Sequence, residues 1–123
     1  MLHRYLPVMW LALSVVCTSC TSRNMDRARI TQCAVGAACV VEGQLIATKG
    51  KGRIEDESGC IAVALPTYVD DDWNLQRVKA SGSVYKAPDY PGLITYTIRD
   101  RVFDAEACYS GLAMYVDQIE QSR

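Results

Sequence analysis

The 123-residue sequence predicts a mainly β fold, a small Greek-key barrel of five to six strands with a short helix between strands three and four. Three observations predict it. Short segments rich in aliphatic and β-branched residues recur along the chain, turn-forming residues separate them, and single glycines interrupt two of them. A content of 50% hydrophobic and 22% charged residues suits one folded core, and the length allows one domain.

Strands one and two are expected soon after residue 38. Strand one covers residues 39–48 around Gly43, because a glycine inside a strand usually marks a bulge or a tight bend. A turn at residues 49–52 then leads to a short second strand at residues 53–56.

A tight hairpin turn at residues 57–59 joins strand two to strand three, which is expected at residues 60–66. Asp56 is the best candidate for a hydrogen bond that caps this turn. Within strand three, large aliphatic residues on one face alternate with Ala62 and Ala64 on the other. One face of strand three therefore carries large side chains and the other carries small ones.

The second half of the barrel begins after three consecutive aspartates, Asp70 to Asp72, which favour the start of a helix of one or two turns. Strand four follows at residues 78–86 with an internal Gly82, and a Pro/Gly-rich loop occupies residues 88–92.

Two further segments complete the chain. Residues 93–100 alternate in polarity and predict a long strand. Residues 112–121 are compatible with a helix or a strand by pattern, and a strand is chosen because the barrel needs a closing strand at this place.

Residues 1–19 are expected to form a signal peptide. His3 and Arg4 precede an apolar run at residues 8–16, which is too short for a membrane-spanning helix but has the length of a signal-peptide apolar region. The sequence Cys17-Thr18-Ser19-Cys20 follows and resembles the cleavage site of a bacterial lipoprotein. This resemblance implies that Cys20 is lipidated and anchors the chain to a membrane of the bacterial cell envelope, facing the periplasm. The alternative is ordinary signal-peptide cleavage.

The mature chain is expected to have two parts. Residues 20–32 are polar and lack a hydrophobic period, so they are assigned to a flexible tether. Residues 33–123 contain all the predicted strands and form the barrel domain.

Several short motifs in this domain resemble the loose pattern of the OB-fold family. They are Val41-Glu42-Gly43-Gln44-Leu45, Asp56-Glu57-Ser58-Gly59 with Ile61-Ala62-Val63, and Ala80-Ser81-Gly82-Ser83-Val84. The resemblance covers roughly residues 39–120 and implies a five-stranded barrel closed by residues 114–119. The segment at residues 93–111 departs from the family pattern, because it adds a strand or hairpin between the fourth and fifth strands.

The same resemblance implies how four cysteines pair. Strands three and five of an OB-fold run parallel as neighbours, which places Cys60 beside Cys108 and leaves Cys33 to pair with Cys39. The rival arrangement joins Cys39 to Cys60 and Cys33 to Cys108, and the sequence alone leaves both open.

Catalysis and metal binding are not expected. The only histidine is His3 in the leader, so a Ser-His-Asp triad or a histidine-containing metal site is excluded from the mature chain. The three aspartates are consecutive, and consecutive side chains do not converge on one cation. The sequence thus predicts a non-enzymatic protein without a cofactor.

A recognition site is expected around the Pro/Gly-rich loop and the inserted segment, with Tyr90, Tyr96, Arg99 and Arg101 as its members. The hypothesis is a binding module for a protein or glycan partner in the envelope. One alternative is that the tyrosines only cover the barrel and that the chain is a structural or accessory lipoprotein without a soluble ligand. Oligonucleotide binding is the least favoured, because the net charge is −1 and no basic run is present.

Overall fold

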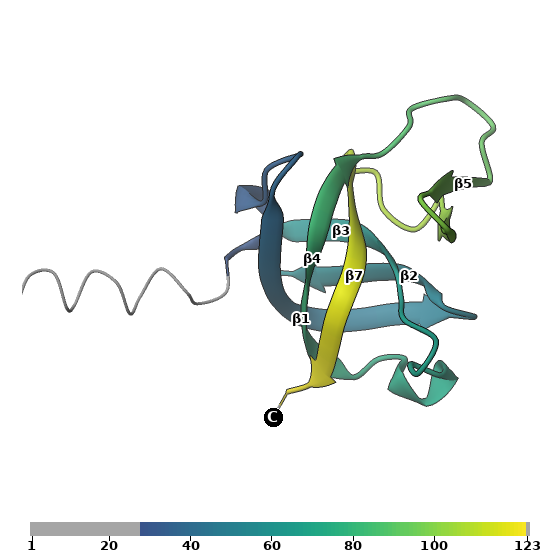
Figure 1. The fold of residues 1–123 in the computed structure, drawn as a ribbon. Helices are drawn as coiled ribbons and strands as arrows, with labels where there is room; N and C mark the ends of the chain where they lie inside the picture. The colour runs from purple at the N-terminus through teal and green to yellow at the C-terminus, as the bar shows by residue number, and fades with distance from the viewer. Residues whose placement is uncertain (1–27, 123) are drawn as a thin grey trace, which may run out of the picture.

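Five strands form a closed barrel in the computed structural model, which describes residues 28–122 (Figure 1). These strands are β1 (Ala38–Thr48), β2 (Lys51–Asp56), β3 (Gly59–Ala64), β4 (Arg77–Lys86) and β7 (Leu112–Gln121). A separate hairpin of β5 (Thr95–Ile98) and β6 (Arg101–Asp104) is inserted between β4 and β7. The predicted mainly β barrel is confirmed, and of the two alternatives for the inserted segment, a strand or a hairpin, the structure has the hairpin. The predicted signal peptide and Cys20 lie outside the described residues.

The barrel strands lie in the order β1-β2-β3-β7-β4, and β4 closes the ring by pairing with β1. Every pair is antiparallel except β3 with β7, which run parallel. This parallel ladder is short and has Val63 opposite Met114 at its centre. Strand order and the single parallel pair are compatible with an OB-like fold.

Aliphatic side chains fill the barrel interior. Buried residues alternate with more exposed ones along β1 and β4, as expected for strands with one face inward. The largest inward side chains have almost no exposed surface: Val41, Leu45, Ile54, Ile61, Val63, Val78, Val84, Met114 and Val116. The interior is therefore a packed core.

Both glycines predicted inside strands, Gly43 and Gly82, lie where backbones approach very closely. A Cβ atom on Gly82 would lie 2.0 Å from the carbonyl oxygen of Tyr115, and one on Gly43 would lie 2.2 Å from that of Glu55. The register between β4 and β7 shifts between Ser81 and Gly82, so the irregularity predicted at Gly82 is present. Only glycine fits these two positions without moving the neighbouring strand.

The folded part of the chain begins earlier than the sequence predicts. The sequence assigns residues 20–32 to a flexible tether, but Ala28 forms a bridge with Val41 and Ile30 is fully buried in the core. A single 3-10 turn, η2 (Ile30–Gln32), holds Ile30 in place. One isolated apolar residue creates no hydrophobic period, which is why the pattern did not indicate its burial.

The helix predicted between strands three and four is only the 3-10 turn η3 (Asp71–Trp73). An aspartate caps it as expected, since the Asp70 side chain accepts a hydrogen bond from the backbone N–H of Asp72 at 3.1 Å. The turn ends after three residues because the chain then pairs with β1. There, the backbone N–H of Leu75 donates to the carbonyl of Leu45 at 2.7 Å.

The Asp56 carboxylate joins the β2–β3 turn to η2. Its Oδ1 accepts hydrogen bonds from the backbone N–H groups of Ser58 at 2.7 Å and Gly59 at 3.1 Å, so the predicted turn cap is confirmed. Its Oδ2 accepts from the backbone N–H of Ile30 at 3.0 Å. Burial opposes the charged form, but the hydrogen bonds from the Ser58 side chain and from these backbone groups outweigh it and lower the pKa of Asp56.

The variant Asp56→Asn is expected to lower the free energy of unfolding by about 1–2 kcal/mol at neutral pH, because an amide nitrogen cannot accept from the Ile30 N–H. Since the folded-state pKa of Asp56 is lowered, its stabilisation is complete above the unfolded-state pKa and is lost as pH falls through the folded value. Urea unfolding at neutral and acidic pH measures both effects, with exposed Glu57→Gln as the control. An equal loss in both variants would contradict this role.

Candidate functional site

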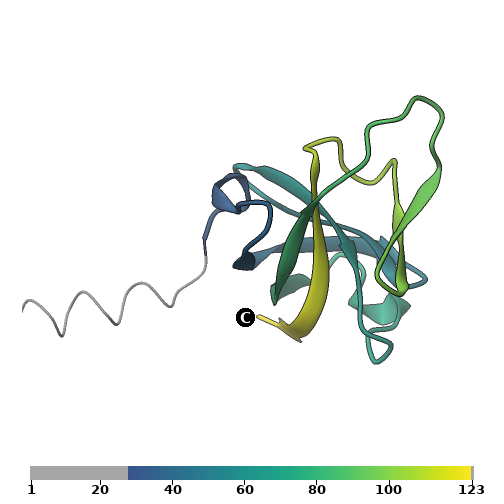
Figure 2. The ribbon, with the colours of Figure 1, turned by 45° about the horizontal axis from the view of Figure 1, so that its top comes forward.

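Side chains of the inserted β5–β6 hairpin pack on the outside of the barrel against residues of β3 and β7. Figure 2 shows the hairpin beside the barrel. Phe103 of β6 is fully buried there against the alanines that face outward from these strands, Ala62, Ala64 and Ala113. The Tyr96 ring stacks on Phe103 with 5.2 Å between centroids and 9° between planes. The small alanines leave the space that these two rings fill, so a second apolar cluster lies outside the barrel.

The turn of this hairpin is bonded to the barrel through Arg101. Its Nη1 donates to the carbonyl oxygen of Ala64 in β3 at 3.0 Å and to that of Val116 in β7 at 2.6 Å. Because those carbonyls belong to the two parallel strands, one guanidinium connects the hairpin to both sides of the ladder.

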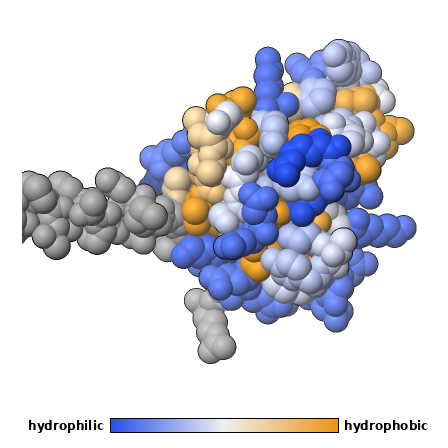
Figure 3. Space-filling model, viewed as in Figure 1, coloured by the Kyte–Doolittle hydropathy of each residue, from blue (hydrophilic) through white to orange (hydrophobic). Residues whose placement is uncertain are grey.

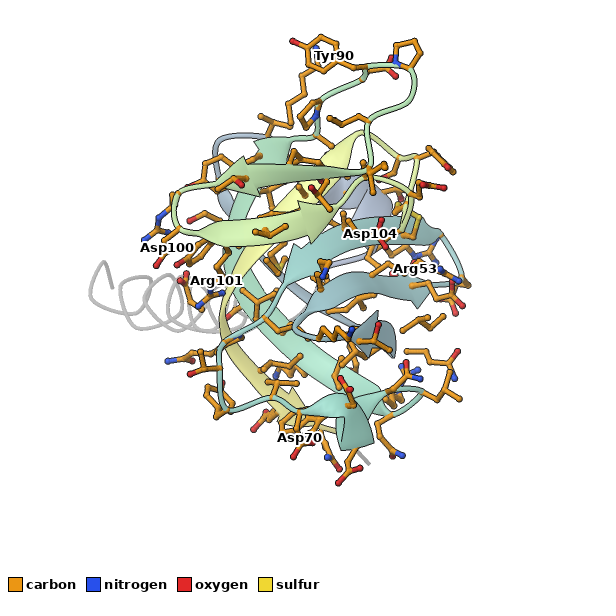
Figure 4. The ribbon with its side chains drawn as sticks, turned by 90° about the vertical axis from the view of Figure 1, so that its right-hand side faces the viewer. Arg53, Asp70, Tyr90, Asp100, Arg101 and Asp104 are labelled. Atoms are coloured by element: carbon orange, nitrogen blue, oxygen red, sulfur yellow. A yellow bond between two sulfur atoms is a disulfide. The ribbon has the colours of Figure 1, made fainter. Side chains whose placement is uncertain are left out.

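The side chain of Tyr115 in β7 also contacts the hairpin turn. The guanidinium carbons of Arg99 and Arg101 lie 4.0 and 3.9 Å from the centroid of its ring. Its hydroxyl donates a hydrogen bond to Asp100, which lowers the pKa of Asp100 and raises the pKa of Tyr115. Figure 4 shows Asp100 and Arg101 together at this end of the hairpin.

The structure brings three of the four predicted recognition residues together and separates the fourth. Tyr96 stacks on Phe103, and Arg99 and Arg101 lie over the ring of Tyr115, which belongs to the same apolar cluster. The Tyr96 side chain is half-buried, and burial, helped by the charge of Asp104, raises its pKa to about 12. Tyr90 is 72% exposed and lies at the tip of the loop that precedes the hairpin, away from Arg101 (Figure 4).

Tyr90 lies at a hollow of about 390 Å³ that sequence analysis did not identify. We call it the aromatic hollow; its main lining residues are Pro88, Asp89, Tyr90, Leu93, Glu106 and Tyr109. Tyr109 is 83% exposed, and Ile94 beside the hollow is 68% exposed. Figure 3 shows hydrophobic surface in this upper right part of the molecule, where the inserted segment lies in Figure 1.

Two disulfides fix the chain around this end of the barrel. Cys60 at the start of β3 is bonded to Cys108, with 6.0 Å between their Cα atoms, and Cys33 is bonded to Cys39, with 5.7 Å. This is the pairing that the OB-fold resemblance implies. The Cys60–Cys108 disulfide also positions Tyr109, which directly follows Cys108. This neighbouring cysteine is the signal in the sequence that could have pointed to Tyr109.

Backbone hydrogen bonds hold both sides of the aromatic hollow. The N–H of Ala105 donates to the carbonyl of Ile94 at 2.9 Å, and the N–H of Ala87 donates to that of Gly111 at 2.9 Å. A turn closes over Tyr90, whose carbonyl accepts from the N–H of Leu93 at 3.2 Å. The loop is therefore held at its two ends, and its tip forms a turn.

A second hollow of about 480 Å³ lies between the β1–β2 turn and the turn of the inserted hairpin. Lys49, Lys51 and Arg101 line it together with Asp70 and Asp71, so it presents both signs of charge. The Arg101 guanidinium there is already hydrogen-bonded to the barrel. Because its lining carries both signs of charge, this hollow favours neither a cation nor an anion as a ligand.

No helix within residues 28–122 is long and apolar enough to cross a membrane. In the same range, no group of three His, Cys, Asp or Glu side chains is placed to hold a metal ion. Two of the three consecutive aspartates have local roles: Asp70 caps η3, and Asp71 accepts a hydrogen bond from the backbone N–H of Lys49 at 2.9 Å.

Comparison with known proteins found no protein-family model, no curated protein and no solved structure that matches the chain.

Proposed function

We propose that this protein is a lipid-anchored protein of the bacterial envelope whose OB-like barrel is a non-catalytic binding module for a protein or glycan partner. The partner binds at the aromatic hollow. The observation that carries the proposal is the exposure of two tyrosines, Tyr90 and Tyr109, on two segments that line one hollow and are held at their ends by hydrogen bonds and a disulfide.

Exposed tyrosines on a loop that is held at both ends favour recognition over packing. A tyrosine ring offers apolar area and a hydroxyl at a small cost in conformational entropy, which is why such residues are common in binding surfaces. Pro88 and Pro91 restrict the loop, and the Cys60–Cys108 disulfide restrains the segment that carries Tyr109. Binding at this surface would require little ordering of the protein.

The place of the hollow relative to the N-terminus also supports the proposal. The described chain begins at Ala28 on the left of the barrel in Figure 1, whereas the loop of residues 88–94 extends at the upper right. With the anchor on Cys20, only a few residues before Ala28, the aromatic hollow would face away from the membrane and be open to a partner in the periplasm.

The anchor is tested by Cys20→Ala. We expect this variant to lose metabolic labelling by palmitate and to leave the membrane fraction, while Cys17→Ala keeps both properties. Retention of the label and of membrane fractionation by Cys20→Ala would refute the lipoprotein assignment.

The binding role is tested by placing a photo-reactive amino acid at Tyr90 in intact cells. We expect a discrete covalent adduct that is lost when Tyr109→Ala is added, because both side chains line one hollow. The same photo-reactive group at exposed Asp72, in η3, is the matched control. If Tyr90 gives no adduct, or gives the same adducts as Asp72, the module has no partner at this hollow.

A further inference from the structure

The aromatic hollow has a second chemical property besides its tyrosines. Asp89 lies on the same loop as Tyr90, and Glu106 lies on the segment that carries Tyr109. Both carboxylate residues are exposed, and within the described chain no lysine or arginine lines this hollow. Its lining therefore carries two negative charges and two aromatic rings.

This combination is selective for a cation. The face of a tyrosine ring attracts an ammonium or guanidinium group, and this attraction adds to that of a nearby carboxylate. Anionic ligands are disfavoured by both carboxylates. A neutral apolar ligand would gain from the rings and from Leu93, but it would leave the two carboxylates without a favourable contact.

We propose that the aromatic hollow takes a positively charged side chain, arginine or lysine, from an exposed segment of a protein partner, an inference that rests on the binding function proposed above. The cation lies between Asp89 and Glu106, with the rings of Tyr90 and Tyr109 against its alkyl stem and its charge. A hollow of about 390 Å³ has room for one such side chain and its neighbours in an extended peptide.

The geometry of the loops supports this occupant. Gly92 has a φ of +78°, a left-handed conformation that lets the loop turn back between Tyr90 and Leu93. The segment that carries Glu106 and Tyr109 is bonded to the barrel through the Cys60–Cys108 disulfide. The loop that carries Asp89 and Tyr90 is held at its two ends, by the hydrogen bonds of Ala87 and Ile94, which limits how far these side chains have to move when the partner binds.

The probe is a capped Gly-Gly-Arg-Gly-Gly peptide, titrated into the purified mature protein and followed by the amide chemical shifts of Tyr90 and Tyr109. The comparison peptide carries citrulline, whose neutral urea group has nearly the shape of guanidinium. We expect saturable shifts with the arginine peptide and at least about fivefold weaker binding of the citrulline peptide. Added salt should weaken arginine binding, because the carboxylates are exposed.

Paired variants identify the groups responsible. Asp89→Asn with Glu106→Gln is expected to weaken arginine-peptide binding at least about fivefold. The matched control, Asp117→Asn with Glu120→Gln, removes two exposed charges from β7 and should leave binding unchanged. Tyr109→Phe keeps the ring and should keep binding, whereas Tyr109→Leu should weaken it.

The remaining outcomes of these experiments overturn the inference, and they show whether the proposed binding function fails with it. Equal binding of the two peptides, or an equal loss in both charge-removing pairs, overturns cation selectivity and leaves the binding module intact. Shifts at Tyr90 and Tyr109 with chitotriose and with neither peptide replace the basic partner by a glycan. An absence of shifts with all three probes, together with no photo-adduct at Tyr90, overturns this inference and the proposed function together.

Discussion

Replacing Cys60 and Cys108 together with alanine is expected to lower the free energy of unfolding by about 4 kcal/mol. The two residues are 48 positions apart, so their bond removes much of the conformational freedom of the unfolded chain. The bond also holds the start of β3 beside the segment that precedes β7. Urea unfolding of the oxidised protein, followed by circular dichroism, measures the loss.

The second disulfide provides the control for this prediction. Cys33 and Cys39 are only 6 positions apart, so replacing both with alanine should cost less, about 2 kcal/mol in the same chain-entropy model. An equal loss for the two pairs would show that chain entropy does not set the difference. Peptide mapping without reduction that joined Cys60 to Cys39 would contradict the pairing itself.

Phe103→Ala is the second substitution with a large expected effect, a loss of about 3–5 kcal/mol. Phe103 is fully buried between the hairpin and the outward alanines of the barrel, and the stacked ring of Tyr96 would lose its partner. We expect the hairpin to leave the barrel surface while the barrel interior stays folded. Amide exchange should therefore increase in β5 and β6 more than in β1.

Val102→Ala is the matched control within the same strand. Val102 is 47% exposed, so its truncation should change stability by less than about 0.5 kcal/mol. If Phe103→Ala were as mild as Val102→Ala, the hairpin would not be packed on the barrel as described.

The strand layout follows from the sequence where burial alternates with a period of two, as in β1 and β4, and the last strand follows from the need of a barrel for a closing strand. The closing strand predicted at residues 112–121 coincides with β7. The strand predicted at residues 93–100 is shorter, because Arg99 adopts a φ of +60° and starts the hairpin turn. A positive φ at a residue other than glycine has no clear sequence signal, so this turn was not predictable.

The sequence could not predict that Arg99 and Arg101 pack near the barrel while Tyr90 stays exposed elsewhere. This separation depends on which face of the hairpin meets the barrel. Arg99 and Arg101 have the composition of a recognition surface, yet both contact Tyr115. A signal was present in strand three, where Ala62 and Ala64 leave space on the outer face. Two small residues on the face opposite the core indicate that another element covers it, and that element is the hairpin.

The short parallel ladder between β3 and β7 determines the expected order of folding. Short turns join β1, β2 and β3, so these strands can pair early, whereas Ala62 meets Ala113 only after a long loop has closed. An intact Cys60–Cys108 bond shortens that search, so we expect the oxidised protein to refold faster than the reduced one. Until the ladder forms, β3 and β7 each present an unpaired edge, and a newly made chain is exposed to aggregation for longer while its cysteines stay reduced.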